Sequence, residues 1–542
     1  MDDAQRDVIA FLRDPSSYPP GAGPIEIPVE VPVEVIETHA SIVFLAGQYA
    51  YKLKRAVKYP YLDFSTAARR LAACTAELKL NRRTAPLLYL EVRAISRRSD
   101  GSLVWGRVDD HAGDSGSASR GDSAGASGGD PLDFVVVMRR FDQHDLLENL
   151  ARAGGLSVPL IYALSAHIAG FHAKAEPRLD RGGSAAMAEL AETNIDCLRA
   201  CRSAGFAAAQ IDRIAAATRG ELARVGALLD ERRAAGKVRR CHGDLHLRNI
   251  CLVDGRPVLF DCVEFSEDLA SIDVLYDLAF LLMDLNHRGH RGLANLVLNR
   301  YLDLTEEDEG LAALPLFLSF RATIRAHVGA TMAEHGWGAG DPGDPASAFA
   351  EARRYLDEAE AALAPQAARL VAVGGLSGSG KSLLAAGLAP ELGRLPGARG
   401  LRSDVLRKLR FGAEPETALP PEAYTGEISA LVYRDLCARA TLALRAGYSV
   451  VIDAVALREG ERRSFAAVAA AAGVPFTGLW LDAPAETMMA HIAGRRSDAS
   501  DASREVLGQQ LARDPGALDW SRIDAGGDPD ATLAAARRAM TH

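Results

Sequence analysis

The sequence predicts an α+β domain with two lobes, followed by an α/β domain built on a parallel sheet. The chain has 542 residues, which is more than one ordinary hydrophobic core accommodates. Strand-like patterns dominate residues 25–60 and recur up to residue 141, after which the chain is largely helical to residue 335. From about residue 365, apolar β-runs alternate with helical segments, which is typical of a parallel sheet with crossover helices.

Two segments of unusual composition define the predicted domain limits. Residues 109–131 are rich in Gly, Ser and Asp and have too few apolar residues to pack, so we expect a disordered insertion. A Gly- and Pro-rich stretch ends at residue 345 and precedes a charged helical segment. We therefore predict a first domain over 1–345, a linker helix over 346–364 and a second domain over 365–542.

The composition excludes some classes of protein. The net charge of −9 argues against nucleic acid as a general partner, because nucleic-acid binding favours basic surfaces. The seven cysteines form no CxxC pair, and the chain does not open like a signal peptide. The longest apolar run, at 278–285, is too short to span a bilayer. These features predict a cytoplasmic protein without a membrane partner, and they leave its oligomeric state open.

A phosphate-binding motif stands near the start of the second domain. Gly375 begins a GxxxxGK[ST] pattern that continues through Gly378 and Gly380 to Lys381 and Ser382, between a β-run and a helical run. Glycines let backbone N–H groups surround phosphate oxygens, and the helix N-terminus adds partial positive charge. We expect all five residues to bind ATP, with Lys381 at the β- and γ-phosphates and the Ser382 hydroxyl on Mg²⁺.

Five further polar residues complete the predicted site of this domain. Asp453 ends a strand and is expected to hold the Mg²⁺ water shell, or else to cap the strand. Asp404 is a candidate general base for an acceptor hydroxyl, with Arg407 beside it to bind substrate; the alternative for Asp404 is a helix N-cap. Arg495 and Arg496 suit a lid that contacts the ATP phosphates, or else form a solvated charge run.

Residues 365–542 resemble the small P-loop kinases related to zeta toxin and gluconate kinase. The phosphate-binding motif, SDVLRK at 403–408 and RRSDASDA at 495–502 carry the resemblance. It implies a P-loop NTPase fold and phosphoryl transfer to a small molecule. No arginine-finger signature of ring-forming AAA machines is present, so a motor function is not expected.

A second constellation lies in the first domain, between two short β-runs. His242, Asp244 and Asn249 share one loop, and Asp261 ends the following strand. Asp244 is expected to accept the proton of an attacking hydroxyl, while Asn249 and Asp261 hold Mg²⁺ against the ATP phosphates. His242 would brace the loop through hydrogen bonds.

Such a site also needs a phosphate-contacting lysine that a glutamate positions. Lys52 lies in the strand-like run YAYK, and Glu77 lies in the helix that follows; both are expected at the ATP site. Lys54 lies on the same strand face and is a rival to Lys52, and Glu77 has the alternative of a solvated helix charge. Asp277, in an apolar helix, is expected to anchor the catalytic loop.

Residues 25–335 resemble the aminoglycoside phosphotransferase-like kinases, a group that includes choline and homoserine kinases. The elements THASIVFLAGQYAYKLKRAV, ELKLNRR and HGDLHLRNI carry the resemblance, which implies a bilobal, protein-kinase-like fold. The order of the two domains is similar to a bacterial fusion of a phosphotransferase with an ATP-binding protein. Asp261 is followed by Cys-Val instead of Phe-Gly, so we expect small-molecule phosphorylation without the protein-kinase activation switch. The acidic run 264–268 would attract a cationic substrate or form a solvated loop.

The sequence therefore predicts an ATP-dependent phosphotransferase with two ATP-binding domains. Its cofactors would be ATP and Mg²⁺, and its acceptors small-molecule hydroxyls. Alternatives are a nucleotide-dependent regulatory or toxin-like protein in which only one domain is catalytic, and a nucleic-acid end kinase.

Overall fold

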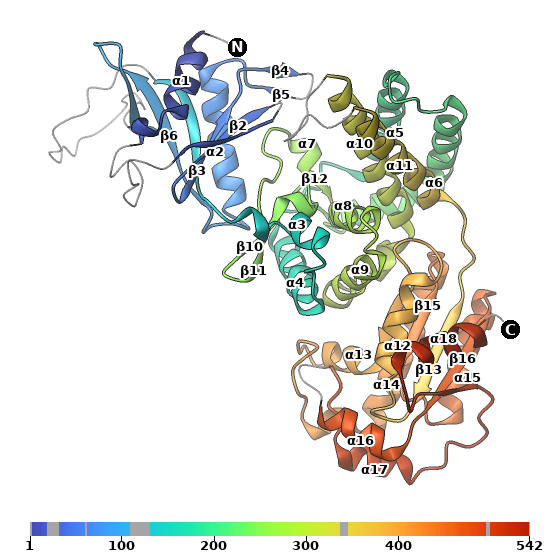
Figure 1. The fold of residues 1–542 in the computed structure, drawn as a ribbon. Helices are drawn as coiled ribbons and strands as arrows, with labels where there is room; N and C mark the ends of the chain where they lie inside the picture. The colour runs from blue at the N-terminus through green and yellow to red at the C-terminus, as the bar shows by residue number, and fades with distance from the viewer. Residues whose placement is uncertain are drawn as a thin grey trace.

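The computed structural model describes residues 3–18, 32–38, 40–59, 62–108, 131–335, 345–494 and 499–540. Figure 1 shows a sheet-containing lobe, a helical lobe and an α/β domain in this order along the chain. Residues 109–130 of the predicted insertion, and the predicted lid residues Arg495 and Arg496, lie outside the described residues.

The first lobe is a six-stranded antiparallel sheet with a helix on each face. Its strand order is β1-β2-β3-β8-β6-β7. Val135 and Val137 of β8 share a buried cluster with residues of α1, whereas Phe134 and Val136 share one with Cys74 of α2, as the two-residue period of a strand requires. The elements are α1 (Asp3–Arg13), β1 (Glu34–Glu37), β2 (Ser41–Ala46), β3 (Tyr49–Lys54), β4 (Lys58–Tyr59), β5 (Leu62–Asp63), α2 (Ala67–Asn81), β6 (Tyr89–Arg97), β7 (Leu103–Arg107) and β8 (Pro131–Arg139).

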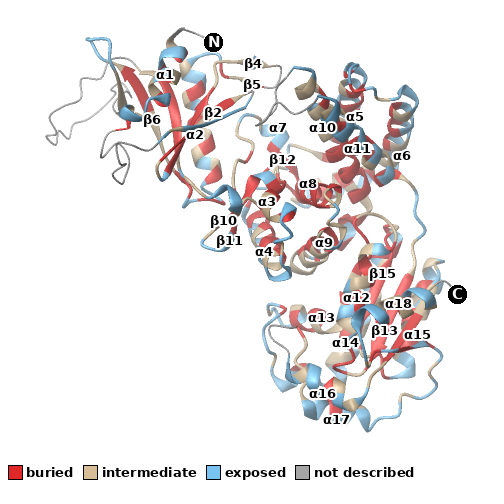
Figure 2. Cartoon of the chain, viewed as in Figure 1, coloured by how far each residue is buried: buried red, intermediate tan, exposed pale blue. Residues whose placement is uncertain are grey.

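The second lobe is a helical assembly around α8, which is buried along almost its whole length (Figure 2). The hairpin of β10 and β11 and the antiparallel pair of β9 and β12 contribute the loops of the predicted catalytic site. The elements are α3 (Leu147–Arg152), α4 (Val158–Lys174), α5 (Gly183–Ala200), α6 (Ala208–Ala234), β9 (Val238–Arg240), β10 (Ile250–Val253), β11 (Arg256–Leu259), α7 (Glu267–Ala270), β12 (Ser271–Asp273), α8 (Val274–His287), α9 (Arg291–Thr305) and α10 (Leu314–Glu334).

The segment predicted as a linker helix forms α11 (Pro345–Leu363). It packs against α10 and α6, and Ala352, Tyr355 and Leu356 are buried in this contact. The helix therefore covers the helical lobe instead of bridging two domains through solvent.

The second domain is a five-stranded parallel sheet flanked by helices, as predicted. Its strand order is β14-β15-β13-β16-β17. The last strand was not predicted, because only Ile523 of its four residues is buried and the apolar signal is weak. The elements are β13 (Leu370–Gly375), α12 (Lys381–Leu388), β14 (Arg399–Arg402), α13 (Ser403–Arg410), α14 (Gly426–Arg445), β15 (Val450–Asp453), α15 (Glu459–Ala472), β16 (Phe476–Asp482), α16 (Ala485–Ala493), α17 (Arg504–Leu511), β17 (Ser521–Asp524) and α18 (Pro529–Ala539).

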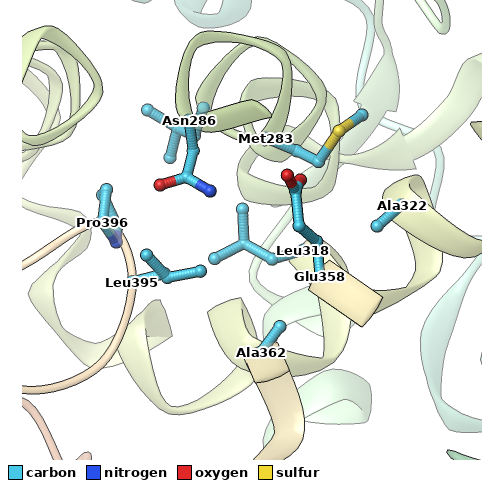
Figure 3. Close-up of a pocket in the computed structure, with 9 residues that line it drawn as sticks. Met283, Asn286, Leu318, Ala322, Glu358, Ala362, Leu395 and Pro396 are labelled. Atoms are coloured by element: carbon cyan, nitrogen blue, oxygen red, sulfur yellow. The ribbon is translucent and has the colours of Figure 1, made fainter. Parts of the chain in front are cut away.

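The two domains share an extensive contact. One buried apolar cluster runs from the helical lobe into the α/β domain, and α9 packs against α13. A small pocket at this contact lies among α8, α10, α11 and the loop at Leu395 and Pro396 (Figure 3). It has room for about one water molecule, so it is not a substrate site.

Candidate active sites

The first site begins with a buried ion-pair cluster between the sheet and α2. Lys52 Nζ on β3 lies 2.8 Å from Glu77 Oε1 and 2.5 Å from Asp261 Oδ1. The Asp261 side chain is 40% exposed, whereas that of Glu77 is fully buried. Lys52 therefore connects a buried carboxylate to one that remains open to a ligand.

The rival lysine has different partners. Lys54 Nζ lies 2.5 Å from Glu77 Oε2 and also forms an ion pair with Glu264. Burial acts to raise the pKa of Glu77, but Lys52 and Lys54 hold it well below its usual range. Glu77 is thus an ionised, buried group and not a solvated helix charge. Glu264 is also buried, so it is not available to attract a cationic substrate.

The predicted catalytic loop places an open carboxylate beside the metal candidates. Asn249 Nδ2 donates to Asp244 Oδ2 at 2.8 Å and to the Asp244 carbonyl at 2.9 Å. His246 Nε2 lies 3.3 Å from Asp244 Oδ2. Burial acts to raise the pKa of Asp244, but His246 and His242 hold it well below its usual value. The side chain is ionised and 41% exposed, as a group that receives a substrate proton must be.

The buried helix α8 stabilises the predicted catalytic loop through hydrogen bonds from Asp277. Asp277 accepts hydrogen bonds from the backbone N–H of His242 at 3.0 Å and of Gly243 at 2.9 Å, and His172 Nε2 lies 3.1 Å away. His242 Nε2 contacts the Phe260 carbonyl at 2.9 Å, and burial lowers the His242 pKa so that its ring is neutral. His242 thus joins the catalytic loop to the segment after β11 that carries Asp261.

Two backbone contacts, one of Asp261 and one of Cys262, were not predicted. Its φ of 60° is unusual for a residue other than glycine, and its N–H donates to Tyr89 Oη at 3.1 Å. The next N–H, that of Cys262, donates to Asn81 Oδ1 at 2.9 Å. Asn81 lies within the ELKLNRR motif, so its position was a signal, but nothing in the sequence indicated its partner.

The phosphate-binding loop of the second domain has the backbone that such a loop needs. Gly375, Gly378 and Gly380 have φ values of 137°, 87° and 89°, which favour glycine. A Cβ on Gly378 would lie 2.5 Å from the Met488 carbonyl. Lys381 Nζ donates to the Leu376 carbonyl at 2.9 Å, within the loop itself.

The predicted metal ligands of this domain are adjacent. Ser382 Oγ donates to Asp453 Oδ2 at 2.6 Å. An unpredicted residue joins them: Arg402 Nη2 donates to Ser382 Oγ at 3.0 Å, and Arg402 Nε lies 3.2 Å from Asp453 Oδ2. Arg402 precedes the SDVLRK motif, and no sequence pattern distinguished it from the many other arginines.

Asp404 lies in the first turn of α13, whereas the N-cap of that helix is Arg402. Burial and the neighbouring Asp453 raise the pKa of Asp404, against the lowering effects of Arg402 and Lys381. Asp404 is therefore part of the same electrostatic cluster as the phosphate-binding loop, and it does not cap the helix.

Arg407 is turned into the protein. It is buried, donates to the Ala423 carbonyl at 2.6 Å and to Ser429 Oγ at 3.3 Å, and lies over the Tyr424 ring at 5.0 Å. These contacts occupy much of its guanidinium, so Arg407 fixes the segment around Tyr424 against α13.

The residues of both sites fit Mg²⁺ and a nucleotide phosphate. Oxygen ligands suit Mg²⁺, and the set formed by Asp244, Asn249 and Asp261 and the pair of Ser382 and Asp453 supply them. Lys52 lies beside Asp261 of the first set, and Lys381 directly precedes Ser382 of the second, so each set has a neighbouring lysine that suits phosphate. Among the described residues, no helix is long and apolar enough to cross a membrane.

Comparison with known proteins matches both domains. The profile of the phosphotransferase enzyme family (APH) matches residues 186–314, and that of an AAA domain (AAA_33) matches residues 370–514. Two solved structures are similar to parts of the chain: a sugar kinase from Janibacter sp. (28% identity, 32% of this chain and 95% of that one, TM-score 0.26) and a choline/ethanolamine kinase family protein from Mesorhizobium loti (14%, 66% and 99%, TM-score 0.35).

Relatives extend over both domains together. Uncharacterized proteins of Mycobacterium tuberculosis and Mycobacterium bovis are 30% identical over 507 residues, which is 91% of this chain and 92% of theirs. The chain therefore belongs to the same family as these mycobacterial proteins, a fusion of an aminoglycoside phosphotransferase-like kinase domain with a P-loop kinase domain of the AAA type.

Proposed function

We propose that the chain transfers the γ-phosphoryl group of ATP to small-molecule hydroxyls, at one site in each domain. The observation that carries this proposal is the ion-pair cluster of Lys52, Glu77 and Asp261 together with the open carboxylate of Asp244. His242 connects the two, because its ring contacts the Phe260 carbonyl beside Asp261 and the backbone N–H of Asp244. Phosphoryl transfer needs such a division between phosphate binding and orientation of the acceptor.

In the first domain, Lys52 contacts the ATP phosphates while Glu77 holds its ammonium group in place. Asn249 and Asp261 hold Mg²⁺, which neutralises phosphate charge when bound. Asp244 accepts a hydrogen bond from the acceptor hydroxyl and takes its proton as the new P–O bond forms and the bond to ADP breaks. Its low pKa makes it a weak base that serves mainly to orient the hydroxyl.

In the second domain, backbone N–H groups of the loop and Lys381 bind the phosphates, and Ser382 and Asp453 hold Mg²⁺. Asp404, with its raised pKa, is the stronger proton acceptor of the two domains and takes the proton of a second acceptor. Arg407 contributes to acceptor binding through Tyr424, over whose ring its guanidinium lies. We place both reactions in the cytoplasm.

The test is transfer of label from γ-labelled ATP into a small-molecule extract of the source cells. Wild type, Asp244→Ala and Lys381→Ala are compared, and free phosphate is counted separately. We expect one labelled organic product to be lost with Asp244→Ala and another with Lys381→Ala. If only one variant loses product, the other domain is regulatory. If only free phosphate forms, the phosphotransferase proposal is wrong for both domains.

A further inference from the structure

Strand β14 of the P-loop domain contacts the kinase-like domain at its first residue and the P-loop site at its last. It contains only four residues, Arg399 to Arg402. Its first residue, Arg399, is fully buried and forms ion pairs of 2.7 Å with Asp303 and with Asp308, both from the kinase-like domain. Its last residue, Arg402, contacts Ser382 and Asp453 in the P-loop site. At about 3.3 Å per residue, the two ends lie roughly 10 Å apart.

The kinase-like domain holds this strand at several points. Asn299 Oδ1 on α9 accepts from the Gly400 N–H at 2.8 Å and lies 3.2 Å from Arg399 Nη1. Asp308 Oδ2 also lies 3.0 Å from Arg439 of α14, so one carboxylate binds two elements of the P-loop domain. The contacts of Arg399 and Arg439 are charge-assisted, and Arg399 and Asp308 are buried, so these contacts depend strongly on geometry.

Inside the P-loop domain, β14 is the edge strand of the sheet and pairs with β15, so its position also depends on its contacts with the kinase-like domain. Arg402 pairs in parallel register with Asp453 of β15, and Arg399 with Val450. The Arg402 guanidinium donates a hydrogen bond to the hydroxyl of Ser382, which follows Lys381 in the phosphate-binding motif. A phosphate bound by Lys381 therefore lies within the range of the Arg402 side chain.

We propose that Arg402 is a phosphate-contacting residue of the P-loop site, and that Asn299, Asp303 and Asp308 of the kinase-like domain are positioning residues that act on it through β14. The affinity of the P-loop site for ATP thus depends on residues of the other domain. This inference rests on the proposed function, because it requires that the P-loop site binds nucleotide.

The experiment measures the affinity of the full-length chain for a fluorescent ATP analogue in Mg²⁺. A Lys52→Met background weakens binding at the first site, and the part of the signal that is lost when Lys381→Ala is added belongs to the P-loop site. Arg402→Met should weaken this binding about tenfold, the usual effect of losing one charge-assisted hydrogen bond. Asn299→Ala and Asp308→Asn should weaken ATP-analogue binding by a smaller factor, roughly threefold, because they displace the Arg402 side chain and do not remove it.

A double-mutant cycle distinguishes an effect of Asn299 that acts through Arg402 from a general weakening of the contact between the domains. In an Arg402→Met background, Asn299→Ala should have no further effect on affinity, because the residue through which it acts is gone. Glu416→Gln is the matched control: it breaks a 2.9 Å ion pair with Arg300 across the same contact without touching β14, and should leave affinity unchanged.

Folding of each variant is checked by circular dichroism. If Asp308→Asn does not fold, Asn299→Ala, which removes no charge, still decides the question. Unchanged affinity in Asn299→Ala, an additive effect in the double variant, or an equal loss in Glu416→Gln would each overturn the inference. A binding signal that Lys381→Ala leaves undiminished would instead overturn nucleotide binding at the P-loop, and this inference with it.

Discussion

The two lysines of β3 have a common partner but are expected to serve different purposes. Lys52 reaches Asp261, whose carboxylate is open to ligand, whereas Lys54 reaches Glu264, which is buried. We predict that Lys52→Met weakens nucleotide binding at the first site with a small loss of stability. Lys54→Met should cause a large loss of stability and a small loss of nucleotide binding.

The expected magnitudes follow from burial. The Lys54 side chain is 3% exposed, and its loss leaves Glu264 as a buried carboxylate without its ion-pair partner. Breaking such a pair costs about 3–5 kcal/mol of unfolding free energy. Loss of Lys52 leaves Glu77 still paired with Lys54, so the stability cost is smaller. It removes a charged contact to phosphate, however, which corresponds to a tenfold to roughly hundredfold rise in Kd.

The assay combines urea unfolding with titration of a fluorescent ATP analogue, in a Lys381→Ala background that silences the P-loop site. Lys54→Met with Glu264→Gln is the matched control, because removing both charges should recover part of the lost stability. Loss of nucleotide binding in a folded Lys54→Met variant, with binding retained in Lys52→Met, would refute the assignment of Lys52.

Three further predictions concern the loops and the proton acceptors. Asp277→Asn should destabilise the chain by about 2–3 kcal/mol and lower activity at the first site, because a neutral amide replaces a carboxylate that accepts two backbone N–H groups. Unfolding and product formation are measured on the same variant. Gly378→Ala should abolish nucleotide binding at the P-loop, because its Cβ would meet the Met488 carbonyl, whereas Gly380→Ala, with no atom within 4 Å, should incur only backbone strain of about 1 kcal/mol. Asp244 and Asp404 must be ionised to accept a proton, so activity falls as the pH drops through the pKa of each. The pKa of Asp244 is lowered and that of Asp404 is raised. As the pH is lowered, kcat/KM of the second domain should therefore fall at a higher pH than that of the first.

Motifs made of nearby residues could be predicted from the sequence. The two-domain fold class is confirmed by the strand orders and by the family matches, and its signals were local: the GxxxxGK[ST] loop, the loop of Asp244, and the alternation of strands and helices. Local spacing fixes such features because one loop or one strand carries all the residues concerned. The activities of the individual site residues stay predictions.

Contacts between distant residues could not be predicted. Lys54 and Glu264 are separated by 210 residues, and Asp308 and Arg399 by 91. In the sequence each is one charge among 133 acidic and basic residues, and nothing marks it as buried. Burial of a charge depends on its partner, which only the folded chain supplies.

The segment that carries the metal candidate Asp261 is fixed along its whole length, and this fits a small-molecule kinase. We call residues 261–264 the metal segment. Three consecutive backbone N–H groups in it donate to Tyr89 Oη, Asn81 Oδ1 and the His242 carbonyl. The carboxylate of Glu264 then closes the segment through its buried ion pair with Lys54. An activation switch requires two arrangements of similar free energy. Moving this segment outward would break three hydrogen bonds and leave two buried charges poorly paired, which costs far more than the few kcal/mol that separate the states of a switch.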